Sequence, residues 1–231
     1  MNRRTKIVCT LGPASSDSDT IEHMIEAGMN VARMNFSHGS HDDHAERIRT
    51  VREAAKRQGQ TVTILQDLQG PKIRVGQMQD GSVMLKEGQQ LVITPEPLEE
   101  GTAERVHIDY PTLADDADVG GRILLDDGLL ELTITGIDGK EIITEVVEGG
   151  PLRSRKGVNL PNIRTSTPSL TEKDRKDLEF GLSMDVDVVA LSFVRERSDV
   201  EELLGLIEDA GKNVSVVAKI EKPEAVRNIE D

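Results

Sequence analysis

Side chains suited to phosphate and metal chemistry occur in two short segments of the sequence. In MNVARMNFS, Arg33 and Asn35 are two residues apart on an expected strand, so they share one face. In VSVVAKIE, Lys219 and Glu221 repeat this spacing. Such a pair suits an anionic substrate held partly through a divalent cation, because the lysine counters phosphoryl charge and the carboxylate binds Mg²⁺. An interior or rim salt bridge would use the same residues, so both interpretations stay open.

Asp67 ends a third apolar segment and is followed by Lys72 and Arg74. A carboxylate at a strand end near two cations is compatible with an ion site and with a structural ion-pair cluster. The spacing does not separate these alternatives.

Three histidines, His38, His41 and His44, are spaced three residues apart, which is compatible with a metal site. Asp42 and Asp43 lie between the last two on an expected surface helix. We therefore favour a solvated helix face over a metal site.

One segment is locally basic in an otherwise acidic chain. It contains Gly149, Gly150, Arg153, Arg155 and Lys156. It would suit a phosphate tail, or it would form a hinge between domains.

The composition limits the possible partners and compartments. The chain of 231 residues has 42 acidic and 28 basic side chains and a formal net charge of -14. Such a charge disfavours nucleic acids and anionic membranes as partners.

No apolar run approaches the roughly 20 residues of a membrane span, and the single Cys9 has no intrachain disulfide partner. We expect a cytoplasmic protein with Cys9 as a small core residue of an apolar strand. Arginine exceeds lysine, 17 to 11, and with the excess of carboxylates this suggests a halophile.

Alternating periodicities predict βα units in the first part of the chain. The expected strands span residues 6–10, 29–36 and 61–67, and the helices between them span 17–27 and 41–57. The same pattern resumes with a helix at 171–182 capped by Ser169 or Thr171, a strand at 186–193, a helix at 199–210, a strand at 214–220 and a helix from 224. Such alternation implies parallel strands with right-handed crossovers.

Residues 72–168 have a different character. Short β-type runs are expected at 83–85, 90–93, 122–125, 129–135 and 141–147, with turns at 126–128 and 138–139 and no helical period. This pattern predicts an all-β domain inserted into the α/β part. The residues outside this insertion suffice for four to five βα units at about 30 residues each, whereas a closed barrel needs about 250 residues. Either an open sheet or the N-terminal piece of a barrel is expected.

Seven longer motifs follow one another along the chain. They are TKIVCTLGPAS, GMNVARMNFSHG, ILQDLQGPKIRVG, RKGVNLP, LTEKDRKDLEFG, DVDVVALSFVR and VVAKIEKPEAV. In order and approximate spacing the sequence resembles the pyruvate kinase family over its whole length. The resemblance implies an α/β fold, a partial (β/α)8 TIM barrel with about the first five strands, and an inserted all-β lid domain after strand 3. The expected domains are 1–71 and 169–231 for the barrel and 72–168 for the lid.

The resemblance also implies a reaction. Phosphoenolpyruvate would transfer its phosphoryl group to ADP, giving ATP and, after protonation of the enolate, pyruvate, a step of glycolysis. Arg33 would bind the substrate phosphate, and Lys219 would be the catalytic lysine. Glu221 would bind Mg²⁺ or Mn²⁺. The full-length protein would be a homotetramer.

Further residues match the family's nucleotide region. Arg74 and Lys156 would bind nucleotide phosphates. Asn35 and His38 would line the nucleotide site, and Asn35 and Ser37 the monovalent-cation region.

The potassium region departs from many family members. Those members carry Thr and Glu where this chain has Leu68 and Lys72, and they need potassium near the carboxylate matched by Asp67. The ammonium of Lys72 can replace the charge of that ion. We therefore expect activity without added potassium.

The resemblance also implies that parts of the enzyme are missing. The chain stops before the family's Gly-Asp-Leu-Gly segment, whose Asp is the second metal ligand, and before the last three strands and the regulatory domain. We expect the 231 residues alone to be inactive. A non-catalytic remnant that binds phosphorylated ligands or a partner chain is an alternative. A barrel lyase or aldolase is another, although the ordered motifs and the inserted domain argue against it.

Overall fold

The structure is a computed structural model that describes residues 4–161, 163 and 166–231. It divides into two compact units, each with its own hydrophobic core. Unit 1 comprises Met1–Pro71 and Pro168–Asp231, and unit 2 comprises Lys72–Thr167.

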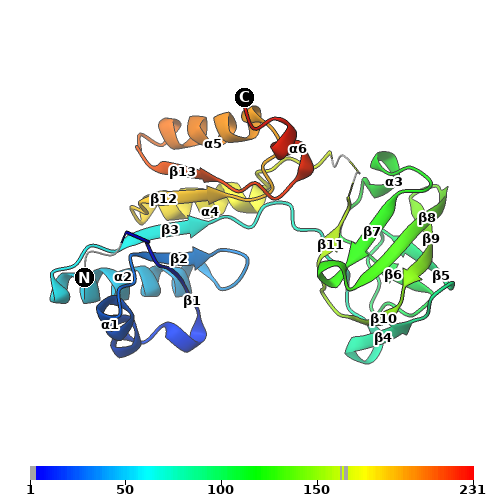
Figure 1. Cartoon of the computed structure of the whole chain (residues 1–231), viewed down its shortest axis with the longest axis horizontal. Coiled ribbons are helices and arrows are strands. Elements are labelled where there is room, and N and C mark those ends of the chain that lie inside the picture. The colour runs from blue at the N-terminus through cyan, green and yellow to red at the C-terminus, as the bar shows by residue number, and fades with distance from the viewer. Residues whose placement is uncertain (1–3, 162, 164–165) are drawn as a thin grey trace. The chain divides into compact units, whose positions relative to one another are not determined.

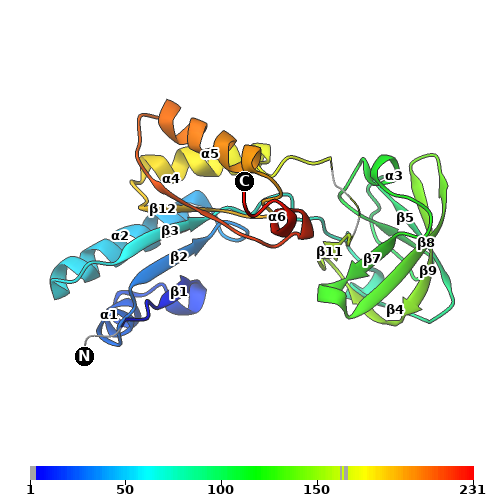
Figure 2. The ribbon, with the colours of Figure 1, turned by 45° about the horizontal axis from the view of Figure 1, so that its top comes forward.

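Unit 1 contains a parallel sheet of five strands (Figure 1). In sheet order these are β1 (Val8–Leu11), β2 (Val31–Asn35), β3 (Thr63–Asp67), β12 (Val188–Leu191) and β13 (Ser215–Ala218). Every neighbouring pair is parallel, and each strand lies beside the previous strand of unit 1. The sheet curls as the first part of a (β/α)8 barrel does (Figure 2), so the predicted partial barrel is confirmed.

Five helices accompany these strands in the described part of unit 1. They are α1 (Ser18–Glu26), α2 (His41–Gln58), α4 (Glu172–Ser183), α5 (Arg197–Asp209) and α6 (Pro223–Arg227), with a 3-10 turn η1 (Pro13–Ser15) after β1. The N-cap of α4 is Thr171, whose hydroxyl accepts a hydrogen bond from the Asp174 amide at 3.1 Å. Ser169, the alternative cap, instead donates its hydroxyl to the carbonyl of Phe193.

The core of unit 1 lies where the helices pack against the sheet. Each helix buries one apolar stripe, as its period of about 3.6 residues requires. Examples are Ile21 of α1, Ile48 of α2 and Leu203 of α5, all fully buried with Met34 of β2. Arg33 and Asn35 alternate with Met34 along β2, so their side chains lie on the opposite face of the sheet. Both side chains are half-buried.

The two outer strands of this sheet are partly exposed. The exposed fraction is 53% for Val8 in β1 and 44% for Val217 in β13. Both strands lie at an edge of the sheet, and an apolar pattern does not reveal edge position. Cys9 is half-buried and packs against the core cluster, as expected for a small core residue.

Unit 2 is built mainly of antiparallel strands. One sheet has the order β11 (Val158–Asn159), β7 (Arg122–Leu125), β8 (Leu130–Asp138), β9 (Glu141–Glu148), β5 (Gln90–Thr94) and β6 (Arg105–His107). A second pairs β10 (Gly150–Arg153) with β4 (Ser82–Leu85), and 3-10 turns η2 (Gln79–Gly81) and η3 (Asp126–Gly128) precede β4 and β8. The predicted all-β insertion is confirmed, with one short exception, the helix α3 (Leu113–Asp116). A single turn is too short to give a helical period.

Of the two alternatives left open for the basic segment around Gly149 and Gly150, the structure does not support the hinge between domains. Gly150–Arg153 is strand β10, which pairs with β4 inside unit 2. Pro151 is compatible with this position because β10 has one neighbouring strand and needs fewer backbone donors.

In the described part of the chain, none of the helices combines the length and apolar character that a membrane span requires.

Candidate functional site

A cluster of charged side chains lies at the carboxyl ends of the strands in unit 1. Its centre is Asp67, whose side chain is only 5% exposed. Arg33 donates to Asp67 Oδ2 through Nε at 2.7 Å, and its second nitrogen lies 2.6 Å from the same oxygen. The third guanidinium nitrogen donates to the Thr10 hydroxyl at 2.7 Å. Residues from β1, β2 and β3 thus meet because parallel strands end at the same edge of a sheet.

Lys219 completes the cluster from the end of β13. Its Nζ lies 3.1 Å from Asp67 Oδ1, 2.7 Å from the hydroxyl of Ser192 and 3.4 Å from Glu221 Oε1. Ser192 donates its own hydroxyl proton to the carbonyl of Leu68 at 2.6 Å. The Lys219 ammonium is therefore held by oxygen atoms of three residues.

The charges of this cluster cancel, since Arg33 and Lys219 face Asp67 and Glu221. The side chains of Arg33 and Lys219 remain 29% and 28% exposed, so both cations can still reach a ligand. Of the two interpretations given to Asp67, the structure shows an ion-pair cluster. Its cations within unit 1 are Arg33 and Lys219.

Glu221 is the carboxylate that the sequence analysis matched to a metal ligand. Its side chain is 38% exposed, and Oε2 accepts a hydrogen bond from the amide of Phe193 at 3.0 Å. Mg²⁺ is commonly held by one or two carboxylates, with substrate phosphates and water as the other ligands, and Glu221 fits such a role. Among the described residues no group of three or more His, Cys, Asp or Glu could hold a metal ion.

Phe193 has an unusual backbone conformation beside Glu221. Its φ is +55°, and strained residues of this kind are concentrated at functional sites. The Lys222 ammonium lies 5.6 Å from the centre of its ring, and burial lowers the pKa of that ammonium. Gly70 lies against the same ring, where an added Cβ would come within 2.7 Å of it. Glycine is required there for this contact and for its φ of +68°.

The loop after β2 carries the residues matched to the nucleotide and monovalent-cation region. Asn35 Oδ1 accepts a hydrogen bond from the Ser37 amide at 3.1 Å, and the Asn35 carbonyl accepts one from the His38 amide at 3.3 Å. His38 is exposed, whereas Ser37 is half-buried.

The predicted solvated helix face is wrong for His44, whereas the side chain of His41 is 44% exposed. His44 is 2% exposed, stacks on Phe36 at 4.1 Å and bonds through Nε2 to the carbonyl of His38 at 2.9 Å. His41 stacks on Phe180 at 4.2 Å and bonds to Asp177 at 2.7 Å. Exposed Asp42 and Asp43 directly precede His44, so the local sequence did not indicate that this histidine is buried. The metal alternative also receives no support among the residues described.

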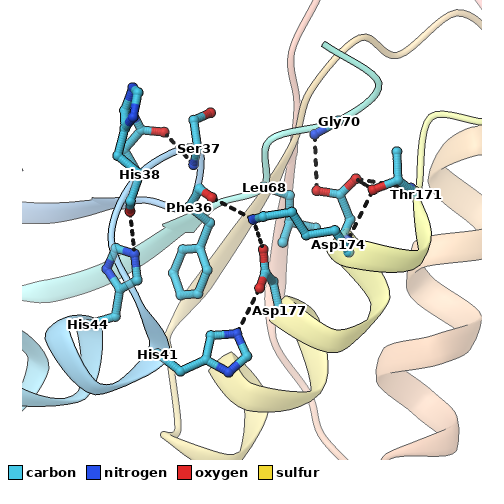
Figure 3. A network of polar contacts seen from close by, with 12 residues as sticks. Phe36, Ser37, His38, His41, His44, Leu68, Gly70, Thr171, Asp174 and Asp177 are labelled. Atoms are coloured by element: carbon cyan, nitrogen blue, oxygen red, sulfur yellow. Dashed lines mark hydrogen bonds and ion pairs between the residues drawn. The ribbon is translucent and has the colours of Figure 1, made fainter. Parts of the chain in front are cut away.

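Helix α4 contributes a polar face to the same region (Figure 3). Lys173 donates to the carbonyl of Phe36 at 2.7 Å and to Asp177 at 2.6 Å. Asp174 accepts a hydrogen bond from the Gly70 amide at 3.0 Å. One helix thus contacts the segments that follow β2 and β3.

In unit 2, the residues matched to nucleotide phosphates lie on adjacent segments. Arg74 forms a bridge with Gly157 and donates to the carbonyl of Arg155 at 2.9 Å. The Lys156 ammonium lies 2.9 Å from Asp126 Oδ1, and its side chain is 34% exposed. Both cations therefore have protein partners and are partly accessible.

The two residues of the potassium departure lie in different units. Leu68 is 1% exposed and its side chain belongs to the core, so only its backbone is polar, and that carbonyl already accepts from Ser192. Lys72 is exposed in unit 2.

Several residues of the site were not predicted. Thr10, Ser192, Phe193, Lys173 and Asp177 contact the candidate residues described above. Ser192 and Phe193 follow a strand end, which was the available signal. The contacts of Lys173 and Asp177 depend on tertiary packing of α4.

Unit 1 is thus an α/β protein of parallel βα units with its candidate site at the carboxyl edge of the sheet, the arrangement of barrel enzymes. The family model described as pyruvate kinase, barrel domain, matches residues 2–231. The chain therefore belongs to the pyruvate kinase family.

Individual relatives support this assignment. The chain is 50% identical to "Pyruvate kinase" of Geobacillus stearothermophilus, with 100% of the chain and 40% of that protein aligned. It is 50% identical to "Pyruvate kinase" of Corynebacterium glutamicum, where 100% and 48% are aligned. For Staphylococcus aureus strain MRSA252 the identity is 48%, over 99% of the chain and 39% of that protein. The chain spans less than half the length of these curated relatives.

Proposed function

We propose that the chain supplies the substrate-binding part of a pyruvate kinase that transfers the phosphoryl group of phosphoenolpyruvate to ADP. The observation that carries the proposal is the contact of Arg33 and Lys219 with one buried carboxylate, Asp67. Two cations fixed in this way form a binding site for a phosphoryl group with little further loss of side-chain freedom.

In the proposed mechanism, Arg33 binds the phosphate of phosphoenolpyruvate and Lys219 follows the phosphoryl group during transfer. The bond from phosphorus to the enol oxygen breaks, and a bond from phosphorus to a terminal oxygen of ADP forms. The enolate then takes up a proton at carbon and becomes pyruvate. Since no protein nucleophile is needed, positioning and charge compensation are the main tasks of these residues.

Glu221 would hold Mg²⁺ or Mn²⁺. The four charges of the cluster cancel, so an anionic substrate gains no net attraction from them alone. The divalent ion, when bound, supplies additional positive charge for the phosphoryl group.

The nucleotide and potassium assignments follow from the family membership. Arg74 and Lys156 would bind nucleotide phosphates, and Asn35, Ser37 and His38 would line the nucleotide and monovalent-cation region. Lys72 would replace the potassium ion near Asp67 and Leu68. The protein would be a cytoplasmic glycolytic enzyme, homotetrameric in full length, and its acidic composition suits high salt.

The domain division proposed from the sequence, 1–71, 72–168 and 169–231, corresponds to a barrel part and a lid. A closing lid would exclude water and suppress hydrolysis of the phosphoryl donor.

Pyruvate formation tests the proposed function. Residues 1–231 are joined to the part of the Geobacillus stearothermophilus relative beyond the aligned region, and this joined protein is assayed with phosphoenolpyruvate, ADP and Mg²⁺. We expect turnover that Lys219→Met abolishes. A folded, soluble joined protein without turnover, next to an active parental relative, would contradict the proposal.

A further inference from the structure

The loop after β2 is fixed at its backbone by side chains from two helices (Figure 3). Lys173 of α4 donates to the carbonyl of Phe36 at 2.7 Å. His44 of α2 bonds to the carbonyl of His38 at 2.9 Å. Between these carbonyls lies Ser37, whose amide is held by Asn35. The loop is thus restrained on both sides of Ser37.

The hydrogen-bond chemistry of His44 defines its state. A carbonyl oxygen only accepts hydrogen bonds, so Nε2 of His44 carries the proton. Within the described residues, Nδ1 is buried and has no hydrogen-bond partner. Burial lowers the pKa of His44 and Arg47 lowers it further, against the opposing effects of the His38 carbonyl, Asp177 and Asp43. The neutral ring therefore acts as a fixed donor.

Lys173 is directed to the loop by Asp177, one helical turn away. Asp177 is 4% exposed and accepts from Lys173 at 2.6 Å and from His41 at 2.7 Å. A buried carboxylate retains its charge at low cost only when such partners surround it. The position of the Lys173 ammonium is thereby fixed, and its bond to the Phe36 carbonyl is charge-assisted.

We propose that Lys173 and His44 are positioning residues that hold Ser37 and His38 ready for the nucleotide. They would set the affinity for ADP without touching phosphoenolpyruvate, which Arg33 and Lys219 would bind. The link to ADP rests on the proposed function. The restraint of the loop does not depend on it.

Hydrogen exchange of the 231-residue chain tests the restraint. In Lys173→Met we expect the amides of Ser37 and His38 to exchange about tenfold faster, because a charge-assisted hydrogen bond is lost. Lys176→Met is the matched control, since Lys176 is exposed on the same helix. His44→Phe keeps a ring against Phe36 and removes the donor, so it should also accelerate exchange at His38. The proposal is overturned if Lys173→Met accelerates exchange no more than Lys176→Met, or does so equally throughout β2 and β3.

Calorimetric titration of the same variants with Mg-ADP and with phosphoenolpyruvate tests the link to the nucleotide. We expect Lys173→Met to raise the Kd for ADP about tenfold and to change that for phosphoenolpyruvate less than about twofold. Equal losses for both ligands would overturn the nucleotide assignment. If the unchanged chain binds neither ligand, the proposed function fails, while the exchange experiment still decides whether Lys173 and His44 position the loop.

Discussion

Lys219 Nζ lies 3.1 Å from Oδ1 of Asp67, although 152 positions separate the two residues in the chain. The carboxylate is almost fully buried, and Arg33 contacts its other oxygen. One anion therefore holds two cations that would otherwise repel each other. This arrangement connects the stability of unit 1 with its proposed chemistry.

Asp67→Asn should lower the free energy of unfolding of unit 1. The amide retains the shape of the side chain, removes the anion that Arg33 contacts and leaves Lys219 with Glu221 as its acidic partner. We expect a loss of about 2 kcal/mol, below the figure for fully buried pairs because both cations are partly exposed. Urea unfolding followed by circular dichroism measures it. Asp209→Asn, at an exposed position of α5, is the control, and an equal effect of both substitutions would contradict the role of Asp67.

Gly181→Ala should destabilise the packing of α4 on β3. A Cβ at this position would clash with Oε1 of Gln66. The Gln66 side chain is fully buried, and its Nε2 donates to the carbonyl of Asp177. We expect a loss of about 3 kcal/mol from overpacking.

Gly205→Ala is the matched substitution on α5. Nothing lies within 4 Å of the added Cβ there, and alanine favours a helix by about 1 kcal/mol over glycine. Thermal unfolding of both variants should therefore show shifts of opposite sign. A shift of the same sign would contradict the close contact between Gly181 and Gln66.

The free energy of unfolding should decrease as the pH is lowered below about 6.5, and His44 should cause this decrease. Burial lowers its pKa in the native state, so the unfolded chain binds a proton that the native state does not yet bind. Its contribution is fully present above the unfolded pKa and decreases by up to about 1.4 kcal/mol per pH unit below it, until the native state is protonated as well.

Urea unfolding at several pH values measures this dependence. His44→Gln should reduce the slope between pH 6.5 and the folded pKa, whereas exposed His23→Gln should leave it unchanged. An unaltered slope in His44→Gln would show that other groups cause the dependence.

The sequence predicted the order and type of the elements in unit 1 because strongly periodic segments determine them locally. It did not predict which strands lie at the sheet edges or that His44 is buried, because both depend on packing between distant segments. The partners of Asp67 were missed for the same reason, since the nearest cations in the chain were considered first. Strand β10 was not predicted because Gly149, Gly150 and Pro151 have low strand propensity.

Potassium independence is a separate prediction about Lys72. The joined protein should turn over in potassium-free buffer, with added potassium changing the rate less than about twofold. Lys72→Glu, which restores the residue of many family members, should lower this rate and make it respond to potassium. A strict potassium requirement of the unsubstituted protein would refute the role of Lys72 as the internal cation.

Direct binding of phosphoenolpyruvate tests the central claim, that Lys219 at the end of β13 is part of the substrate site. Calorimetric titration of the 231-residue chain in the presence of Mg²⁺ should show binding that Lys219→Met weakens at least about tenfold. Lys212→Met, which removes a cation paired with Asp185, should leave the affinity unchanged. Equal affinity of Lys219→Met and the unsubstituted chain would contradict the account.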